Sequence, residues 1–343
     1  MARRVTFMGA INEALEQAME KDDRVILLGE DIAGGAGVKH LEDENQDSWG
    51  GCFGVTRGLM PKFGRDRVID TPISEMGYMG AAVGAAATGL RPVPELMFND
   101  FIGFCLDTIL AQGSKMRYMF GGKAKIPMTV RTTHGAGASA AAQHSGAYYG
   151  MLGSIPAVKV VVPSNPYDAK GLLLSAIEDD NIVIFSEDKT LYGQKGEVPE
   201  EYYKVEIGKA KVKREGKDLT IVTIGKMLYV ALEVADRLKE DNIDVEVIDL
   251  ITVAPWDQET IINSVKKTGR LIVIDEANPH NNTATDIASV VSDKAFDYLD
   301  GPVKRVTAPN TPVPFATNLE QLYLPNADRV IEESKEIIED LKK

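Results

Sequence analysis

Short, unbroken apolar runs alternate with helical patterns along the whole chain, and this alternation limits its possible folds more than any other feature. Apolar runs occupy residues 25–28, 219–223 and 271–274, with helical patterns at 166–178 and 228–239. Runs without a polar residue at every second position are typical of parallel strands that are covered on both faces. The pattern therefore predicts an α/β fold, with a doubly wound parallel sheet and a second, smaller α/β domain.

The length and one polar stretch predict where the chain divides. A chain of 343 residues is long enough for two domains, each with its own core. The polar stretch that contains Gly196 and Pro199 predicts a linker over residues 193–205. We therefore expect one α/β domain over residues 1–192 and another over residues 206–343.

The composition excludes several classes of function. A net charge of −13 without a Lys/Arg cluster argues against a nucleic-acid partner. Cys52 and Cys105 form neither a disulfide framework nor a metal spacing. The uncharged run Met76–Leu90 is shorter than the roughly 20 apolar residues that span a bilayer, and no apolar core of signal-peptide length follows Arg3 and Arg4. We expect a cytoplasmic protein without a membrane segment.

Two carboxylates stand where strands are expected to end. Glu75 lies in Asp70-Thr71-Pro72-Ile73-Ser74-Glu75-Met76-Gly77, before a run made mostly of Gly, Ala and Val. It either complements the dipole of that helix, for about 0.3–1 kcal/mol, or is a protonatable acid held away from water for a ligand nitrogen. Glu30 follows the strand at 25–28, where a parallel sheet presents ligand-binding groups, or it is a solvated loop acid.

The helix after Glu75 carries a stripe of small residues. Gly80 and Gly84 lie one turn apart, with Ala81 and Ala85 beside them. The stripe predicts a helix–helix contact at a subunit interface, or tight packing inside one domain. A largely buried amphipathic helix is expected over residues 101–117.

The phosphate-binding signals in the chain are weak. Gly135-x-Gly137-x-x-Ala140 after a predicted strand is superficially a dinucleotide fingerprint. About 20 residues further on, Lys159 and Pro163 lie where an acidic ribose partner is expected. The sequence contains neither a P-loop nor a Gly-Asp-Gly motif, so it offers no recognisable group for a diphosphate.

The segment Asp70–Gly77 resembles the signature of the β subunits of thiamine-diphosphate-dependent 2-oxo acid dehydrogenases. The resemblance implies a pyrimidine-binding domain followed by a C-terminal domain like that of transketolase. It implies that Glu75 hydrogen-bonds the aminopyrimidine ring nitrogen of the cofactor and so tunes its electronics. It also implies that Glu30 lines the polar region near the cofactor, and that Phe101, otherwise a core residue, packs on the pyrimidine.

His144, in Ala142-Gln143-His144-Ser145, matches the family histidine credited with proton transfer and with acyl transfer to a lipoyl group. A structural, hydrogen-bonded histidine is the alternative. The resemblance further implies an α subunit that holds the diphosphate through Mg²⁺, in a heterotetramer of two α and two β chains. The active site would lie between the chains, and a lipoyl-bearing dihydrolipoamide acetyltransferase core would accept the acyl group.

A potassium ion is implied at one turn of the first domain. The positions that match its ligands are Met128, Ala176, Ile177, Asp179 and Asn181. An ordinary Asp/Asn turn explains the same residues.

The substrate expected from the resemblance is acetoin. Gly34–Gly37 and Ser48–Gly51, which flank the acidic insert 42–47, resemble acetoin-type members, and Phe104 replaces a polar residue expected in pyruvate-type members. Pyruvate is the second choice. Two other classes stay open: a nicotinamide oxidoreductase that uses the Gly135 loop, and a non-catalytic assembly subunit.

Overall fold

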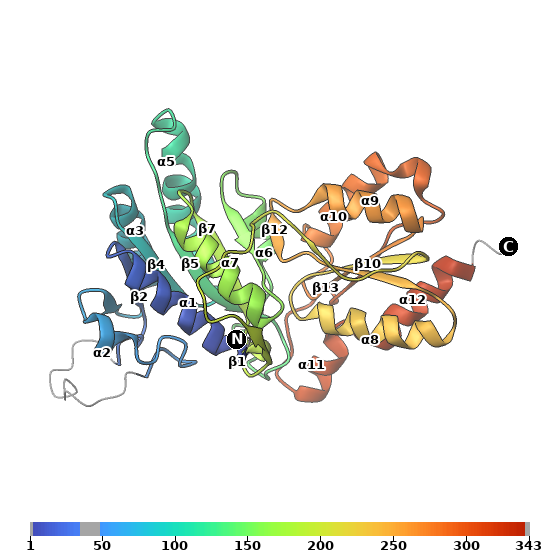
Figure 1. Cartoon of the computed structure of the whole chain (residues 1–343), viewed down its shortest axis with the longest axis horizontal. Coiled ribbons are helices and arrows are strands. Elements are labelled where there is room, and N and C mark those ends of the chain that lie inside the picture. Colours follow the sequence, from blue (N-terminus) through green and yellow to red (C-terminus); the bar gives the residue numbers. More distant parts are fainter. Residues whose placement is uncertain (1–2, 35–48, 340–343) are drawn as a thin grey trace. The chain divides into compact units, whose positions relative to one another are not determined.

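The computed structural model describes residues 3–34 and 49–339, which form two compact α/β units (Figure 1). The first unit contains residues up to 133, together with 155–161 and 165–207. The second contains residues 134–154, 162–164 and the chain from 208 onward. The segment that carries His144 therefore groups with the C-terminal residues. The acidic insert 42–47 and most of its expected flanks lie outside the described residues.

The first unit is built on a parallel sheet. The six strands that this unit supplies lie in the spatial order β6-β7-β5-β4-β2-β3. Their bounds are β2 (Val25–Gly29), β3 (Val68–Asp70), β4 (Arg91–Phe98), β5 (Thr129–His134), β6 (Lys159–Val161) and β7 (Val183–Asp188). β2 pairs in parallel with both β3 and β4, with Leu27 opposite Val68 and Val93. Every residue of β2 is buried, as its unbroken apolar run predicts.

Helices cover this sheet where sequence signals place them. In α1 (Phe7–Lys21), the Thr6 hydroxyl accepts a hydrogen bond from the Gly9 amide at 3.0 Å and so caps the helix. α7 (Pro166–Glu178) begins with a proline in its first turn and has the predicted bounds. α1 packs against α7. α3 (Glu75–Ala87) packs on β4, and the short α2 (Leu59–Phe63) precedes β3.

Helical structure over residues 101–117 is confirmed, but it is neither one regular α-helix nor largely buried. A 3₁₀ turn (Asn99–Phe101) leads into α4 (Ile102–Leu106), a π-helical segment (Asp107–Gly113) and α5 (Ser114–Met119). A helical segment of mixed turn types does not keep all its apolar side chains on one buried face. The exposed fractions of Phe104 and Leu110 are 63% and 41%.

The expected linker contains a strand. β8 (Lys195–Val198) pairs antiparallel with β1 (Arg3–Thr6), and residues 193–205 group with the first unit. Neither short strand has an apolar run, which explains why the sequence pattern missed this pairing.

The second unit has a mixed five-stranded sheet in the order β14-β13-β10-β11-β9. Its elements after residue 207 are β9 (Lys211–Arg214), β10 (Leu219–Thr223), α8 (Met227–Glu240), β11 (Val245–Asp249), β12 (Thr252–Ala254), α9 (Gln258–Thr268), β13 (Leu271–Asp275), α10 (Thr283–Lys294), β14 (Lys304–Thr307), α11 (Thr317–Tyr323) and α12 (Ala327–Glu339). The short α6 (Tyr149–Gly153) also belongs to this unit. α9 and α10 lie on one side of its sheet and α8 and α12 on the other (Figure 1).

The terminal helix α12 is buried along one face. Ala327, Val330 and Ile337 of α12 are buried in the core cluster that α8 forms with the sheet. Its Glu and Lys side chains occupy the opposite face, which is the usual arrangement for an amphipathic helix.

Candidate functional site

Glu75 is the first residue of α3, at the carboxyl end of β3. Asp70, at the end of β3, accepts a hydrogen bond from the Ala33 amide at 2.6 Å, and the Thr71 amide donates to Gly29 O at 2.9 Å. These bonds hold the turn that sets the direction of α3. Glu75 is half-buried, and within the described parts of the chain no group donates a hydrogen bond to its carboxylate. The carboxylate is therefore available to a ligand.

Other acids lie close enough to Glu75 to affect one another electrostatically. Burial raises the pKa of Glu30, and the charges of Asp31, Glu75 and Glu95 raise it further. Burial and the Glu75 charge raise the pKa of the Cys105 thiol to about 12. The structure thus brings Glu30 and Glu75 into one acidic cluster, in which Glu30 holds a proton more readily than an ordinary glutamate.

A buried ion-pair network supports this cluster and was not recognised in the sequence. Arg131 of β5 pairs with Glu95 at 2.5 Å and with Glu187 at 2.8 Å, and all three side chains are buried. Burial lowers the pKa of Arg131, but the charges of Glu187 and Glu95 raise it overall. The sequence did contain a signal, because each of the strands β4, β5 and β7 carries one of these charged residues. A charged side chain in a buried strand needs a partner of opposite charge.

The ring of Phe101 lies at one end of a row of aromatic side chains. Phe101 meets Phe98 edge-on at 5.7 Å, Phe98 meets Phe53 at 5.8 Å, and Phe53 meets Tyr192 at 5.4 Å. Phe101 itself is only half-buried. It is therefore anchored on one side by aromatic packing and keeps surface for another flat ring.

A cavity of about 490 Å³ opens beside Glu30. It is lined by Glu30, Asp31, Trp49, Gly51, Cys52, Phe53, Gly54, Arg57 and Met97. Arg57 brings a cation into this otherwise acidic and aromatic pocket, which has room for a small polar molecule.

The outer face of α3 is apolar and open. Ile73 and Met76 are 75% and 62% exposed. A Cβ built at Gly80 or Gly84 would meet no heavy atom within 4 Å among the residues that the structure describes. Packing inside the domain therefore does not explain the small-residue stripe. An exposed apolar surface next to a half-buried carboxylate is typical of a site that a partner chain completes.

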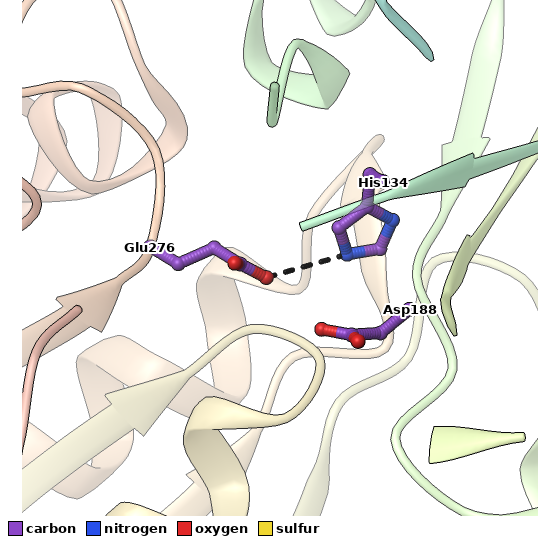
Figure 2. Close-up of side chains that lie close together, drawn as sticks. All are labelled: His134, Asp188 and Glu276. Carbon is purple, nitrogen blue, oxygen red and sulfur yellow. Dashed lines mark ion pairs between the residues drawn. The ribbon is translucent and has the colours of Figure 1, made fainter. Parts of the chain in front are cut away.

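His144 lies in the second unit, in the segment between β5 and α6. It is half-buried, and its amide donates to Ala141 O at 3.3 Å. At the start of the same segment, the buried His134 ring faces the Glu276 carboxylate, with Nε2 3.6 Å from Oε1 (Figure 2). The site residues are thus divided, with Glu30, Glu75 and Phe101 in the first unit and His144 in the second.

The expected potassium positions are engaged with protein groups. Arg91 Nη1 donates to Ile177 O at 2.9 Å and to Asp179 O at 3.0 Å. The side-chain nitrogen Nδ2 of Asn181 donates to the Asp179 carboxylate at 2.8 Å, and Lys159 pairs with that carboxylate. Met128 O accepts from the Val183 amide, and Ala176 O from the Asp179 amide. These bonds suit an Asp/Asn turn, and the potassium site stays a prediction.

The Gly135 loop does not form a dinucleotide site. The amides of Gly137 and Ser139 donate to the carboxylate of Glu320 at 2.6 and 2.9 Å, so a carboxylate of the chain fills the place of a phosphate. The next helix, α6, has five residues and starts only at Tyr149. A dinucleotide-binding fingerprint needs a helix that begins at the glycines. The alternative of a nicotinamide oxidoreductase that uses the Gly135 loop is therefore wrong.

The residues of the first unit fit the pyrimidine end of thiamine diphosphate. Glu75 offers a carboxylate without a donor in the described chain, and Phe101 offers a ring face. The acidic surroundings suit a basic ring nitrogen and oppose a diphosphate.

Comparisons with known proteins agree with this geometry. The family description "Transketolase, pyrimidine binding domain" matches residues 3–195, and "Transketolase, C-terminal domain" matches residues 208–330. A solved structure of a split-gene transketolase, described as an inactive β4 tetramer, superposes with a TM-score of 0.77 at 22% identity and 99% coverage of both chains. At that identity, the superposition supports the fold alone.

Relatives of higher identity narrow the family. The chain is 59% identical to the β subunit of acetoin:2,6-dichlorophenolindophenol oxidoreductase from Bacillus subtilis (strain 168), over 98% of each chain. It is 52% identical to the β subunit of the same name from Cupriavidus necator, over 96% of each. It is 44% identical to the β subunit of the pyruvate dehydrogenase E1 component of Rickettsia felis, over 97% of this chain and 98% of the relative. The chain therefore belongs to the transketolase-like, thiamine-diphosphate-dependent oxidoreductases, among the β subunits that include those of acetoin and pyruvate dehydrogenases.

Proposed function

We propose that this chain is the β subunit of an acetoin dehydrogenase first component, which cleaves acetoin and passes the acetyl unit to a lipoyl group. One observation carries the proposal. Glu75 presents a half-buried carboxylate with no donor in the described chain, at the head of a helix whose outer face is open and apolar. The relatives at 59% and 52% identity, named for acetoin, favour this substrate.

Each site residue then has a defined task. Thiamine diphosphate, when bound, supplies a carbon nucleophile and an electron sink. Glu75 shares a proton with the pyrimidine ring nitrogen, and Phe101 packs on the ring and excludes water from it. Glu30, whose pKa burial raises, holds a proton nearer to neutral pH than an exposed glutamate does. His144 carries protons to and from the reacting groups, because an imidazole can both accept and donate a proton.

The chain is proposed to work only with partners. An α subunit would cover the apolar face of α3 and hold the diphosphate through Mg²⁺, in an assembly of two α and two β chains. A lipoyl-bearing acetyltransferase would then take up the acetyl group. The exposed Ile73 and Met76 and the open Gly80 and Gly84 support such a cover. Within the described residues, no helix is both long and apolar enough to cross a bilayer.

Co-expression of this chain with a cognate α subunit tests the proposal. We expect oxidation of acetoin, with 2,6-dichlorophenolindophenol as acceptor, only when both chains and thiamine diphosphate are present. The chain alone is expected to be inactive. Absence of acetoin turnover by an assembled, cofactor-loaded complex would overturn the proposal.

Pyruvate is the second candidate, favoured by relatives at 43–44% identity over nearly the whole chain. The same assay with pyruvate decides between the two substrates. If Glu75→Gln and His144→Ala leave the assembled complex fully active, the chain is a non-catalytic assembly subunit instead.

A further inference from the structure

The segment that carries His144 has an unfavourable backbone conformation. Gly135, Gly137, Ser139 and Ala141 have φ values of 94°, 105°, 51° and 61°. Two of these four residues carry a Cβ, for which the left-handed region is sterically disfavoured. Gly135 N donates to Gly146 O at 3.3 Å, which closes the segment into a loop just past His144. Such a loop keeps its shape only if other groups hold it.

Glu320 of α11 is the main group that holds it. Its carboxylate accepts hydrogen bonds from Gly137 N at 2.6 Å, from Ser139 N at 2.9 Å and from the Ser139 hydroxyl at 3.4 Å. Glu320 is only 1% exposed. Successive backbone amides in a turn form a concave anion-binding site, and here a buried carboxylate of the same unit fills it.

A second carboxylate holds the preceding residue. Glu276, which follows β13, accepts a hydrogen bond from Ala136 N at 3.2 Å and pairs with Lys226 at 2.9 Å. Lys226 Nζ in turn donates to Ala136 O at 2.5 Å. Both backbone polar groups of Ala136 are therefore bonded to one buried ion pair.

Apolar contacts also hold the loop that carries His144. Ala136 packs in a small buried cluster with Ala308, Val313 and Tyr323. The Ser139 hydroxyl also lies 3.0 Å from that of Thr317, at the start of α11. The loop thus rests against α11 and the chain before it, on the side where Glu320 projects.

We propose that Glu320 is a positioning residue, which fixes the shape of the loop 135–146 and thereby places His144 for proton and acyl transfer. Glu276 and Lys226 assist it at Ala136. In this proposal, the C-terminal unit helps to shape the active site. The catalytic consequence rests on the proposed function of His144, whereas the effect on loop shape does not.

Hydrogen exchange of the full chain in its complex tests the loop directly. Glu320→Gln keeps the size of the side chain but replaces one acceptor oxygen with an NH₂ group that repels an amide donor. We expect exchange at the Gly137 and Ser139 amides to become about ten- to a hundredfold faster, with β10 and β13 unchanged. Glu320→Asp is a milder change that keeps the charge, and it should give a smaller increase in the exchange rate. It serves as the test if Glu320→Gln does not fold.

Gln321→Ala is the matched control, because Gln321 is exposed on the same helix. It should leave the exchange of the loop unchanged. Equal protection of the loop in wild type and in both Glu320 variants would overturn the proposal. Equal loosening of the whole C-terminal unit would overturn it too, because it would make Glu320 a general stability residue.

Activity in two backgrounds tests the link to His144. We expect Glu320→Gln to lower lipoyl-dependent turnover about tenfold or more in the wild-type background, and less than about twofold when His144 is already alanine. A merely structural residue would lower turnover by the same factor in both backgrounds, which would contradict the positioning role. If wild type shows no acetoin turnover, the proposed function fails, while hydrogen exchange still decides whether Glu320 holds the loop.

Discussion

Glu75 and Glu320 are both glutamates of helices, but their surroundings are opposite. Glu320 is 1% exposed and accepts hydrogen bonds from two backbone amides and a hydroxyl. Glu75 is half-buried, has no hydrogen-bond donor in the described chain and is bordered by the exposed Ile73 and Met76. In the proposed function, this difference separates a carboxylate that stabilises the fold from one that binds a ligand.

The two regions that hold the predicted site residues differ in the same way as the two glutamates. The loop before His144 is held by groups of its own unit, whereas the acidic cluster of the first unit borders a surface that the described chain leaves open. A buried polar group without partners costs free energy. Proteins accept this cost mainly at functional sites, where a ligand supplies the missing partner. In the proposed function, the first unit provides part of a site that the α subunit completes.

Replacing Glu75 is the strongest test of this contrast. We expect Glu75→Gln to lower acetoin turnover of the assembled complex by about 10²–10⁴-fold, because the amide cannot share a proton with the pyrimidine nitrogen. The free energy of unfolding should change little, since no described group loses a hydrogen bond. Dye-coupled turnover and thermal unfolding measure the two quantities.

Glu332→Gln, on the exposed face of α12, is the control and should change neither quantity. If Glu75→Gln instead destabilises the chain and leaves turnover intact, Glu75 is a helix-capping residue and the contrast with Glu320 disappears.

Breaking the ion-pair network should have the next largest effect, on stability. Arg131→Met leaves Glu95 and Glu187 buried without their cation, and loss of one partner from a buried network costs about 3–5 kcal/mol of the free energy of unfolding. Chemical denaturation of wild type and variant measures it.

Arg237→Met is the matched change at the surface, because the side chains of its pair with Asp328 are 46% and 83% exposed. It should lower the free energy of unfolding far less than Arg131→Met does, because solvent screens an exposed ion pair. Equal losses in the two variants would show that the network beneath the acidic cluster is as weakly coupled as a surface pair.

A bulky side chain on the small-residue stripe tests whether the open face of α3 is an interface. Because a Cβ at Gly84 has open space within the described chain, Gly84→Leu should fold normally. It should nevertheless weaken binding of the α subunit at least tenfold, measured by size-exclusion chromatography and by titration of activity with α subunit. Glu332→Leu is the control; unchanged α binding by Gly84→Leu would place the interface elsewhere.

Regular elements were predictable because their signals are local. The apolar run at 219–223 and the proline-led helix at 166–178 coincide with β10 and α7 residue for residue. The paired β1 and β8 were missed because each has four residues and no apolar run. The helix expected at 101–117 contains a π segment, which periodicity does not reveal because it depends on packing.

The site was predictable only in part. The positions of Glu75 and Glu30 after predicted strands made them candidates, Phe101 and His144 came from the family resemblance, and the roles of all four stay predictions. Glu320 lay in a segment with no recognised motif, and its function arises from amides about 180 residues away in the sequence. Such a contact is a property of the folded chain, and the local sequence pattern contains no trace of it.

The smallest expected effect is a change in the free energy of unfolding when Glu30, which lies near other acids, is replaced. Because burial and the charges of Asp31, Glu75 and Glu95 raise its pKa above 4.5, the folded chain binds this proton more tightly than the unfolded chain does. Glu30 therefore destabilises the fold at pH values above its folded pKa, and the cost disappears as the pH falls below 4.5. Glu30→Gln should raise the free energy of unfolding at pH 7, by no more than about 1 kcal/mol because the side chain is half-exposed, and the gain should vanish near pH 4. Urea denaturation from pH 4 to 8 measures this difference, with the exposed Glu332→Gln as a control that shows none. A variant less stable than wild type at pH 7 would mean that Glu30, like Glu320, is a satisfied structural carboxylate.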